Sequence, residues 1–512
     1  MRRRLFYNPD MSNDSRAHRA AHIAFFLRVL GTGLAVAVLA AALGQAVAHL
    51  HDLSQVNHVV GEWIALAQAL SDGVFYPPLE QGGHYGGTRY VPVFFVLISG
   101  LAKVTPDYLV AAKLASLLSV GGLLTVVFVA CRRVTGHSAD GLLAAGAALA
   151  FPEVWRALQS PHADALAAAL SVAGLVLCSS ERMGKARLAL ASLLFALAMG
   201  TKFSSVAGPA AACLTVFQRD RRAGLSLAAL TAGLTIGGLF SVNALSDGRF
   251  LENTRALASG GMSAGSLPVG PVRLAYALKY SAILTFVVPI LLPAAGFVLV
   301  RRAREGRFSV WEWYLLFTWG TSALIFASPG TDLNHLLELE VASVLVLVAG
   351  LRPAAPAPSP VTESGIRALF AIALLLALVR QVGEWTSGPA PDAVPPARIA
   401  EAIGDAQPTL SEDPTVPVLM GQRPFILDAF AYRILAEQGR IDPEQLAGRI
   451  RRHEFATLVL LRNVHDPNDP LNARFTEMHF GPQVTRAMAE SYRFEQKVGA
   501  YSIFRPKQPA AD

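Results

Sequence analysis

Residues 24–48 read AFFLRVLGTGLAVAVLAAALGQAVA, and this apolar run decides the class of the protein. Roughly 20 helical residues cross the hydrocarbon core of a bilayer, so the run is long enough to span a membrane. It is too long for the core of a signal peptide, and no small-residue cleavage pattern follows it. We therefore expect a first membrane helix here.

The composition of the whole chain agrees with a membrane protein. Its 512 residues are 53% hydrophobic and only 16% charged, whereas soluble proteins carry about 25% charged residues. The net charge of +7 does not indicate nucleic-acid binding, because the basic residues form short clusters between apolar runs. Cys131, Cys178 and Cys213 lie in or beside apolar runs and show no disulfide or metal spacing.

The topology follows from the apolar runs and the basic clusters between them. The runs are 24–48, 108–131, 138–153, 162–179, 187–201, 203–218, 223–243, 275–300, 310–328, 335–351 and 366–383. The clusters are Arg2 to Arg4 with Arg16 and Arg19; Arg132 and Arg133; Arg182, Lys185 and Arg187; Arg219, Arg221 and Arg222; Arg301, Arg302, Arg304 and Arg307; and Arg352 with Arg367. Eleven spans put every cluster on one side. By the positive-inside rule that side is cytoplasmic, so the N-terminus is predicted inside and the C-terminal part outside a plasma (inner) membrane.

Two of the predicted hairpins are short. Only 31 residues separate Arg187 from Arg219, enough for two helices of about 13–15 residues. Helices this short must end inside protein or beside a wet cavity, because bare backbone ends cannot face lipid. Lys202, in GTKFSS, lies at the tip of this hairpin and indicates a polar cavity; equally, its long side chain reaches the interface without any cavity.

The chain divides into two predicted domains. Residues 1–384 form an all-α polytopic membrane domain with a long first outer loop at 49–107, and residues 385–512 form a small extracytoplasmic α/β domain. The proline-rich PAPDAVPPAR (389–398) joins them. In the second domain we expect strands at VPVLM (416–420) and ATLVLL (456–461), helices at 429–438, 443–452 and 483–492, and a strand pair at 494–504.

The first outer loop holds the leading catalytic candidate. In HLHDLSQVNHVVGEWIALAQALSDGVFYPPLE (49–80), Glu62 starts a helical pattern that places Trp63, Leu66 and Leu70 on one face. A carboxylate at the start of a helix also complements the helix dipole without any catalytic role. Both interpretations remain open from the residues alone.

Several segments together resemble the GT-C class of membrane glycosyltransferases. They are the acidic first loop with the aromatic-proline segment at Tyr90 and Pro92, SPHADALAAALSVAGL (160–175), GTKFS (200–204), SPGTDLNHLLELEVASVLVLVAG (328–350) and SEDPTVPVLMGQRPFILDAF (411–430). The chain looks closest to the branch that includes family 39, the protein mannosyltransferases and the aminoarabinose transferases. One departure is the first-loop acid pair of that branch, which here is replaced by Asp52, Asn57-His58 and a lone Glu62.

The resemblance implies an inverting hexosyl- or pentosyltransferase that uses a sugar on a polyprenyl phosphate. It implies a first-loop base, Glu62 or else Asp52, with Asp164 holding the acceptor or the base. Binding roles are implied for the following residues: Lys202 and Arg89 at the leaving phosphate, and His84, Tyr85, Asn334, His335 and Glu338 around the substrates. No cofactor is assigned, and a divalent cation such as Mg²⁺ or Mn²⁺ is left open.

Three functions are compatible with the sequence. The first is a bacterial cell-envelope glycosyltransferase, whose partners are the polyprenyl-phosphate-sugar, the lipid bilayer and an envelope lipid, glycan or protein acceptor. The others are a transporter or flippase of a lipid-linked or small polar substrate, and a non-catalytic envelope scaffold. A transporter predicts polar residues at the membrane midplane and two similar halves. Here the acids and amides gather at the outer ends of spans, which favours the enzyme.

Overall fold

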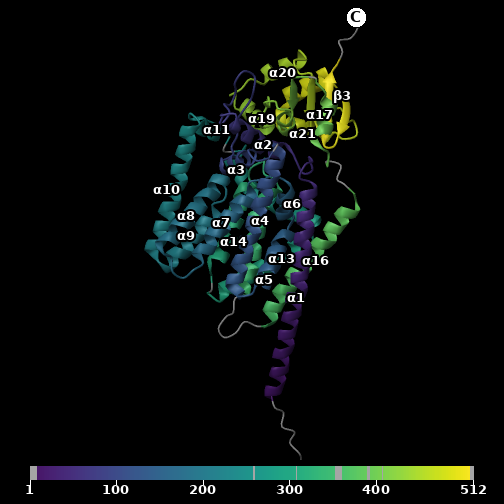
Figure 1. The fold of residues 1–512 in the computed structure, drawn as a ribbon. Helices are drawn as coiled ribbons and strands as arrows, with labels where there is room; N and C mark the ends of the chain where they lie inside the picture. Colours follow the sequence, from purple (N-terminus) through teal and green to yellow (C-terminus); the bar gives the residue numbers. More distant parts are fainter. Residues whose placement is uncertain are drawn as a thin grey trace, which may run out of the picture.

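A bundle of long apolar helices carries a small mixed domain on one end in the computed structural model (Figure 1). The structure describes residues 9–105, 107–257, 260–306, 308–351, 360–388, 393–405 and 407–507. The yellow C-terminal domain lies at the top of Figure 1, and the start of the purple helix α1 lies at the bottom.

Each apolar run predicted from the sequence contains a helix of the bundle. The helices are α1 (Pro9–Ala48), α4 (Tyr108–Thr135), α5 (Ser138–Ala150), α7 (Asp164–Cys178), α8 (Lys185–Thr201), α9 (Ala207–Arg219), α10 (Arg221–Leu245), α12 (Gly270–Leu284), α13 (Val288–Arg304), α14 (Val310–Ile325), α15 (Leu337–Gly350) and α16 (Pro360–Thr386). The run 275–300 is divided between α12 and α13. Pro289 starts α13, where its missing N–H costs nothing.

Fewer helices than the eleven predicted spans are both long enough and apolar enough to cross a membrane alone. Within the described residues, five helices are long and apolar enough to cross a membrane, or six if α5 and the following α6 (Pro152–Gln159), which meet at 81°, count as one broken span. The other predicted spans are shorter or more polar, as the 13 residues of α9 show. Such a helix is only about 20 Å long, which agrees with the short hairpins expected from the sequence.

Basic side chains gather at the end of the bundle opposite the C-terminal domain. Arg133 donates to the carbonyl of Val176 (3.0 Å) and Arg219 donates to that of Cys178 (3.3 Å), so both lie at the end of α7. Further contacts at this end join Arg301 to Thr362 (2.9 Å) and Arg367 to Asp140 (2.9 Å). We call this the basic end, and the opposite one the domain end. Arg2 to Arg4, Arg307 and Arg352 lie outside the described residues, as do the side chains of Arg16 and Arg19.

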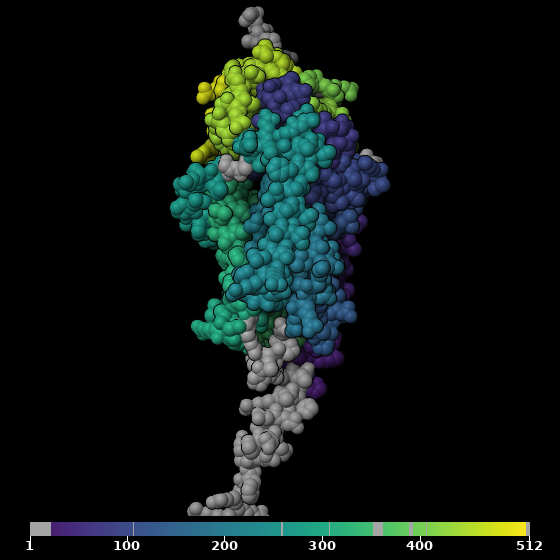
Figure 2. Space-filling view, turned by 90° about the vertical axis from the view of Figure 1, so that its left-hand side faces the viewer, coloured from purple at the N-terminus to yellow at the C-terminus, as the bar shows by residue number. Residues whose placement is uncertain are grey.

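Two long loops cover the domain end. The first contains α2 (His58–Ser71) and α3 (Val93–Leu101), and the second contains α11 (Arg249–Leu257) and the 3₁₀ helix η1 (Ala264–Val269). Asn253 of α11 is fully buried and ties the loops together, because its side chain accepts from Thr88 N (2.8 Å) and donates to Pro77 O (3.3 Å). Figure 2 shows the purple first loop between the yellow domain and the teal second loop.

The C-terminal domain is α/β, as predicted, and α16 ends at Thr386, close to the predicted domain boundary. Its elements are α17 (Pro396–Ile403), β1 (Thr409–Ser411), α18 (Thr415–Leu419), α19 (Ala429–Glu437), α20 (Pro443–Arg451), β2 (Thr457–Leu460), α21 (Leu471–Phe480), α22 (Pro482–Ser491), β3 (Tyr492–Val498) and β4 (Tyr501–Pro506). The sheet order is β1-β2-β4-β3, with only β1 and β2 parallel.

One strand prediction in this domain was wrong. VPVLM forms the short helix α18 rather than a strand. Pro417 lacks an N–H and would interrupt the hydrogen bonds of a strand, and Asp413 accepts from the backbone N–H of Thr415 (2.8 Å) at the start of the helix. The apolar side chains Val416 and Val418 instead join Trp63 of α2 in one buried cluster. The first loop and the C-terminal domain therefore share a hydrophobic core.

Candidate functional site

An ion pair joins the tips of two neighbouring helices at the domain end. Asp164 is the first residue of α7, and Lys202 directly follows the last residue of α8. Lys202 Nζ contacts one carboxylate oxygen of Asp164, and Asn334 Nδ2 donates to the other (2.9 Å). Asn334 lies in the 3₁₀ helix η2 (Leu333–Leu336), ahead of α15. Three segments far apart in sequence therefore meet at one carboxylate.

This ion pair forms part of the wall of a small polar cavity of about 10 Å³, which is room for about one water molecule. The cavity is lined by Asp164, Lys202, Ser204, Ser205, Thr321, Ser322, Ile325, His335 and Glu338. The hydroxyl of Tyr314 donates to Glu338 (3.0 Å), which supplies the buried partner that a carboxyl in an apolar helix requires. Of the two interpretations of Lys202, the structure shows the one with a cavity.

Glu62 lies in α2, buried close to this region but outside the cavity wall. Its side chain is 2% exposed. Burial raises the pKa of Glu62 well above its usual range, and the nearby charge of Asp428 raises it further. The hydroxyls of Thr88 and Tyr90 and the positive charge of Arg89 oppose this rise without cancelling it. Burial therefore favours the neutral form of the Glu62 carboxyl group.

Asp52 occupies a different place, just after α1. Its carboxylate contacts His49 Nδ1 (2.7 Å) and Lys113 Nζ (3.4 Å) and accepts from the backbone N–H of Ser54 (2.9 Å). Lys113 also donates to the carbonyls of Asp52 (2.7 Å) and Ser54 (3.2 Å). Asp52 thus anchors the chain where it leaves α1, and it does not line the cavity of Asp164.

Arg89 connects the first loop to the cavity and to the C-terminal domain. Its guanidinium group lies 5.5 Å from the centre of the Phe430 ring. It is also within electrostatic reach of both Glu62 and His335. The backbone that leads to Arg89 passes close to the carbonyl of Pro78 at Gly86, where a Cβ would collide with that oxygen. A glycine at this position therefore lets the loop pack as it does ahead of Arg89.

His84 and Tyr85 lie farther from the cavity, against the C-terminal domain. The His84 ring stacks on Phe425 (centroids 4.4 Å apart), and its Nδ1 lies 3.0 Å from the carbonyl of Pro424. Tyr85 is buried edge-on against Tyr432 (4.9 Å). Burial lowers the pKa of His84, and the charges of Arg423 and Arg449 lower it further.

Two residues near the site had no signal in the sequence. Asp428 caps α19 by accepting from the backbone N–H of Phe430 (2.8 Å) and Ala431 (3.1 Å), which is a common structural role. Only the docking of the domain brings it near Glu62. His58, at the start of α2, packs against His479 of the domain (ring centroids 4.4 Å apart). Within the described ranges, no group of three or more His, Cys, Asp or Glu side chains is placed to hold a metal ion.

Comparisons with known proteins place these observations in a class. A model of glycosyltransferase family 87 matches residues 88–329, which include Arg89, Asp164 and Lys202. The motifs had suggested the GT-C class, and this match to a glycosyltransferase family agrees with that class. A search of curated protein sequences finds no match.

Solved structures give the fold. The crystal structure of ArnT from Cupriavidus metallidurans in the apo state has a TM-score of 0.57 and 14% sequence identity to this chain, and covers 92% of this chain and 98% of its own. The same protein bound to undecaprenyl phosphate has a TM-score of 0.55 with the same identity and coverage. An oligosaccharyltransferase of Archaeoglobus fulgidus has a TM-score of 0.48 at 10% identity, and covers 96% of this chain and 74% of its own.

The fold and the family model agree with the resemblance found in the sequence. The multi-pass helical bundle, the loops at one end and the mixed C-terminal domain are matched over almost the full length of ArnT. The prediction of the GT-C class is confirmed: this chain has the architecture of a GT-C membrane glycosyltransferase.

Proposed function

We propose that this protein transfers a sugar from a polyprenyl-phosphate donor to a hydroxyl or amine of a cell-envelope acceptor. The observation that carries this proposal is the cavity at the domain end, where Asp164, Lys202 and His335 meet. Charged side chains at membrane depth are costly and usually mark a substrate site. The ArnT structure with undecaprenyl phosphate supports the same class of donor by analogy.

The donor suits this arrangement physically. Its lipid chain stays in the bilayer while its phosphate and sugar approach the Asp164–Lys202 pair from the domain end, where the small cavity must widen to admit them. Lys202, and Arg89 on the loop beside it, supply positive charge for the phosphate. A donor phosphate also competes with Asp164 for Lys202, and this competition frees the carboxylate of Asp164 at the moment when the donor is bound.

The transfer step is a displacement at the anomeric carbon. The acceptor oxygen or nitrogen forms a bond to this carbon while the bond from carbon to phosphate oxygen breaks, so the configuration inverts. The acceptor proton passes to a carboxylate acting as general base. The phosphate leaves with the electron pair, and cationic side chains stabilise its developing charge.

The structure favours Asp164 over the two first-loop acids as the base. Asp164 lines the cavity. Burial raises the pKa of Glu62 and favours its neutral form, and Asp52 is occupied by Lys113 and His49. We therefore assign Glu62 to holding Thr88 and Tyr90, which flank Arg89, and Asp52 to anchoring the loop.

The site faces the outside of the plasma membrane in this proposal. The positive-inside rule puts the basic end in the cytoplasm, because Lys and Arg are retained on that side during insertion. The C-terminal domain and the cavity then lie together at the extracytoplasmic face, where lipid-linked sugars and envelope acceptors meet.

Mass spectrometry of envelope lipids, glycans and proteins tests the function. Cells that lack the protein should accumulate an envelope component shortened by a sugar, and the wild-type protein should restore it. Asp164→Asn and Lys202→Met should lower the restored product by at least about 100-fold, the size expected for loss of a general base. Glu62→Gln and Asp52→Asn should keep activity wherever the protein folds.

The control is Asp405→Asn, an exposed aspartate of the C-terminal domain. All variants are compared at equal amounts of membrane-inserted protein. An unchanged envelope composition in the deletion strain would contradict the proposed transferase activity. The non-catalytic scaffold would then be the remaining interpretation. A deletion strain that accumulates intact donor on the wrong leaflet would indicate the flippase instead. Full restoration by both Asp164→Asn and Lys202→Met would overturn the site assignment.

A further inference from the structure

Two histidines face each other where the C-terminal domain meets the first loop. His58 is the first residue of α2, and His479 lies in the last turn of α21 of the domain. The centroids of their rings are 4.4 Å apart, and the rings are tilted by 52°. Neither residue lines the cavity of Asp164. The pair is therefore a contact between two parts of the protein that lies outside the proposed transfer step.

The two rings of this pair are held differently. His479 Nδ1 contacts the carboxylate of Glu412, which is buried and accepts from the backbone N–H of Leu461 (2.7 Å). The His479 ring also packs against Phe475, with ring centroids 4.6 Å apart. By contrast, the buried Nδ1 atom of His58 has no hydrogen-bond partner among the described residues. An anchored ring of the domain thus meets a ring of α2 that has an unsatisfied nitrogen.

Charged groups from two parts of the protein surround His58. Burial lowers the pKa of His58, and the charge of His479 lowers it further. Glu412 and Asp428 of the domain and Asp332, which precedes η2, oppose this change. The lowering is the larger effect, so the pKa of His58 falls from its usual 6.5 to about 4. The His58 ring is therefore uncharged at neutral pH while the domain is docked.

The position of His58 links this contact to the functional site. Glu62 lies one helical turn after His58 in α2, and Asp428 is within electrostatic reach of both residues. Asp332 caps η2, which carries Asn334 to the carboxylate at the site. A movement of the domain away from His58 therefore changes the surroundings of Glu62 and of η2.

We propose that His58 and His479 form an acid-sensitive contact, which holds the C-terminal domain against α2 only while His58 is uncharged. A proton on His58 puts a positive charge in a partly buried place beside His479, and separation of the domain lets water solvate this charge. Both histidines are positioning residues, because they act through α2 and its loop. The effect on docking is independent of the proposed function, whereas the effect on sugar transfer rests on it.

The direction of the pH effect follows from proton binding. When the domain is separated, His58 titrates near its usual pKa of 6.5, so the separated form binds the proton more tightly than the docked form does. Docking is therefore strongest above pH 6.5 and weakens as the pH falls toward about 4. At about pH 5, the equilibrium constant for separation should be about 30-fold larger than at about pH 7.5.

Hydrogen–deuterium exchange of the full-length protein in lipid nanodiscs tests this proposal. Rates are measured at about pH 5 and about pH 7.5 and are corrected for the intrinsic effect of pH on amide exchange. In the wild type, exchange at the lower pH should rise by up to about 30-fold in α21 and in the first turn of α2. His58→Phe keeps a ring that cannot bind a proton, so its exchange should be equal at both pH values. His58→Gln, also uncharged, replaces this variant if the phenylalanine protein does not fold.

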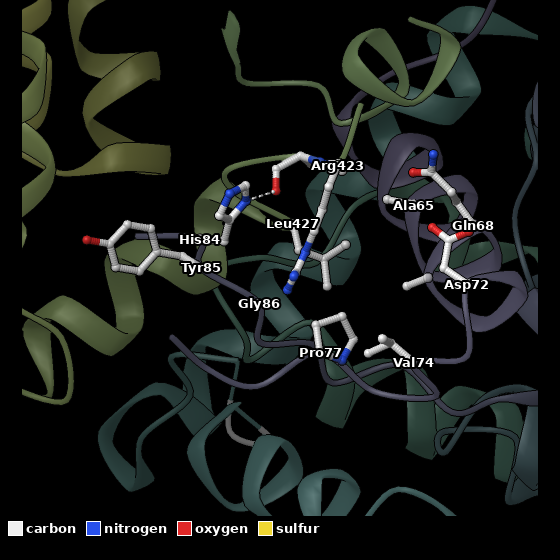
Figure 3. A pocket seen from close by; sticks show the side chains of 12 residues that line it. Ala65, Gln68, Asp72, Val74, Pro77, His84, Tyr85, Gly86, Arg423 and Leu427 are labelled. Atoms are coloured by element: carbon white, nitrogen blue, oxygen red, sulfur yellow. Dashed lines mark hydrogen bonds between the residues drawn. The ribbon is translucent and has the colours of Figure 1, made fainter. Parts of the chain in front are cut away.

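A second histidine of the interface must be separated from this effect. His84 Nδ1 donates to the carbonyl of Pro424 (3.0 Å), and Figure 3 shows His84 beside Arg423, across the pocket from Gln68 of α2. Burial lowers the pKa of His84 too. His84→Phe should nevertheless keep the acid response of α21, because His84 contacts a different segment of the domain. The matched control is His51→Phe, at an exposed histidine of the same loop, which should respond to acid as the wild type does.

Equal exchange of the wild type at both pH values would overturn the proposal, and so would an acid response in His58→Phe as large as that of the wild type. The effect on the site is measured as envelope product in the deletion strain, grown at about pH 5.5 and about pH 7.5. The product of the wild-type protein should fall at the lower pH, whereas that of His58→Phe should not. An acid response of exchange alone would show that the contact does not position the site. Absence of sugar transfer at both pH values would contradict the proposed function and leave the exchange result standing.

Discussion

At the scale of single residues, Asp52, Glu62 and Asp164 show how neighbours decide the state of a carboxyl group. Asp164 meets a lysine in a polar cavity, and Asp52 meets a lysine that also binds the backbone around it. Glu62 is buried near the charge of Asp428, and burial first and this charge second raise its pKa. Three acids that are comparable in sequence therefore differ in accessibility and in electrostatic surroundings.

The raised pKa of Glu62 predicts an effect of pH on stability. Between about pH 4.5, where the unfolded carboxyl titrates, and the higher pKa of the folded state, the folded protein binds a proton that the unfolded chain releases. Stability is therefore lost as the pH rises through this window. Glu62→Gln keeps a neutral side chain of the same shape, so its melting temperature should exceed that of the wild type by a few degrees at pH 8.

Thermal unfolding followed by tryptophan fluorescence measures this effect, with Glu490→Gln on the exposed side of α22 as the control. The gain of Glu62→Gln over the wild type should shrink as the pH falls toward 4.5. A difference that stays constant over this range would show that Glu62 is not held neutral in the folded protein.

Asp140 at the basic end predicts a stability effect without an effect on the site. Its fully buried carboxylate binds Arg367 through two contacts (2.9 and 3.1 Å) and Arg28 through two longer ones (3.3 and 3.4 Å). Asp140→Ala leaves Arg367, only 1% exposed, without this partner. Breaking a buried pair costs about 3–5 kcal/mol, so the melting temperature should fall sharply while activity per folded molecule is kept. An unchanged melting temperature would contradict the importance of this contact.

At the scale of elements, the contact between α2 and α18 joins the first loop to the C-terminal domain. Gly61 lies against this contact, where a Cβ would be 2.8 Å from the backbone nitrogen of Thr415 and would collide with the side chain of Asp413. Asp413 is fully buried and accepts from the hydroxyl of Tyr501 (2.7 Å). Because Asp413 is held in this way, it cannot easily move aside for a larger side chain at position 61.

Gly61→Ala should loosen this contact at a cost on the order of 1–3 kcal/mol, the usual range for overpacking. Hydrogen–deuterium exchange should rise in α18 and in the first turn of α2, and activity should fall because Arg89 depends on the same loop. Gly100→Ala in α3 is the control, since nothing lies within 4 Å of its added Cβ. Equal exchange in both variants would show that Gly61 does not hold the domain in place.

At the scale of the whole molecule, the two ends of the bundle differ in charge and in function. The loop at Arg182, between α7 and α8, lies at the basic end, and Lys497 is exposed on β3 of the C-terminal domain. The proposed orientation therefore predicts opposite accessibility for these two positions. Single cysteines are introduced in a background in which Cys131, Cys178 and Cys213 are replaced by serine or alanine.

In spheroplasts, a membrane-impermeant thiol reagent should label Lys497→Cys at once and Arg182→Cys only after lysis. The reverse pattern would place the cavity in the cytoplasm and overturn the proposed orientation. Labelling of both before lysis would indicate leaky membranes, which a cytoplasmic marker protein measures in the same sample.

The sequence alone determined the helical bundle, the mixed C-terminal domain and the gathering of basic residues at one end. It could do so because these features depend on the transfer of each side chain between water and lipid, which is a local property of the run that contains it. The position of Lys202 at the tip of a short hairpin was also predictable from the sequence. The hairpin has too few residues for two helices that cross the whole membrane. The strand predicted at VPVLM failed because the partner of these residues is α2, some 350 residues away in the chain.

Only the tertiary structure decided which polar side chains meet at the domain end. Asp164, Lys202 and Asn334 come together through the packing of segments far apart in the chain, and Glu62 is brought near Asp428 only by the docking of the C-terminal domain. Proximity between residues far apart in the chain is set by the sum of many packing contacts, none of which is written in the segment that contains the reactive group.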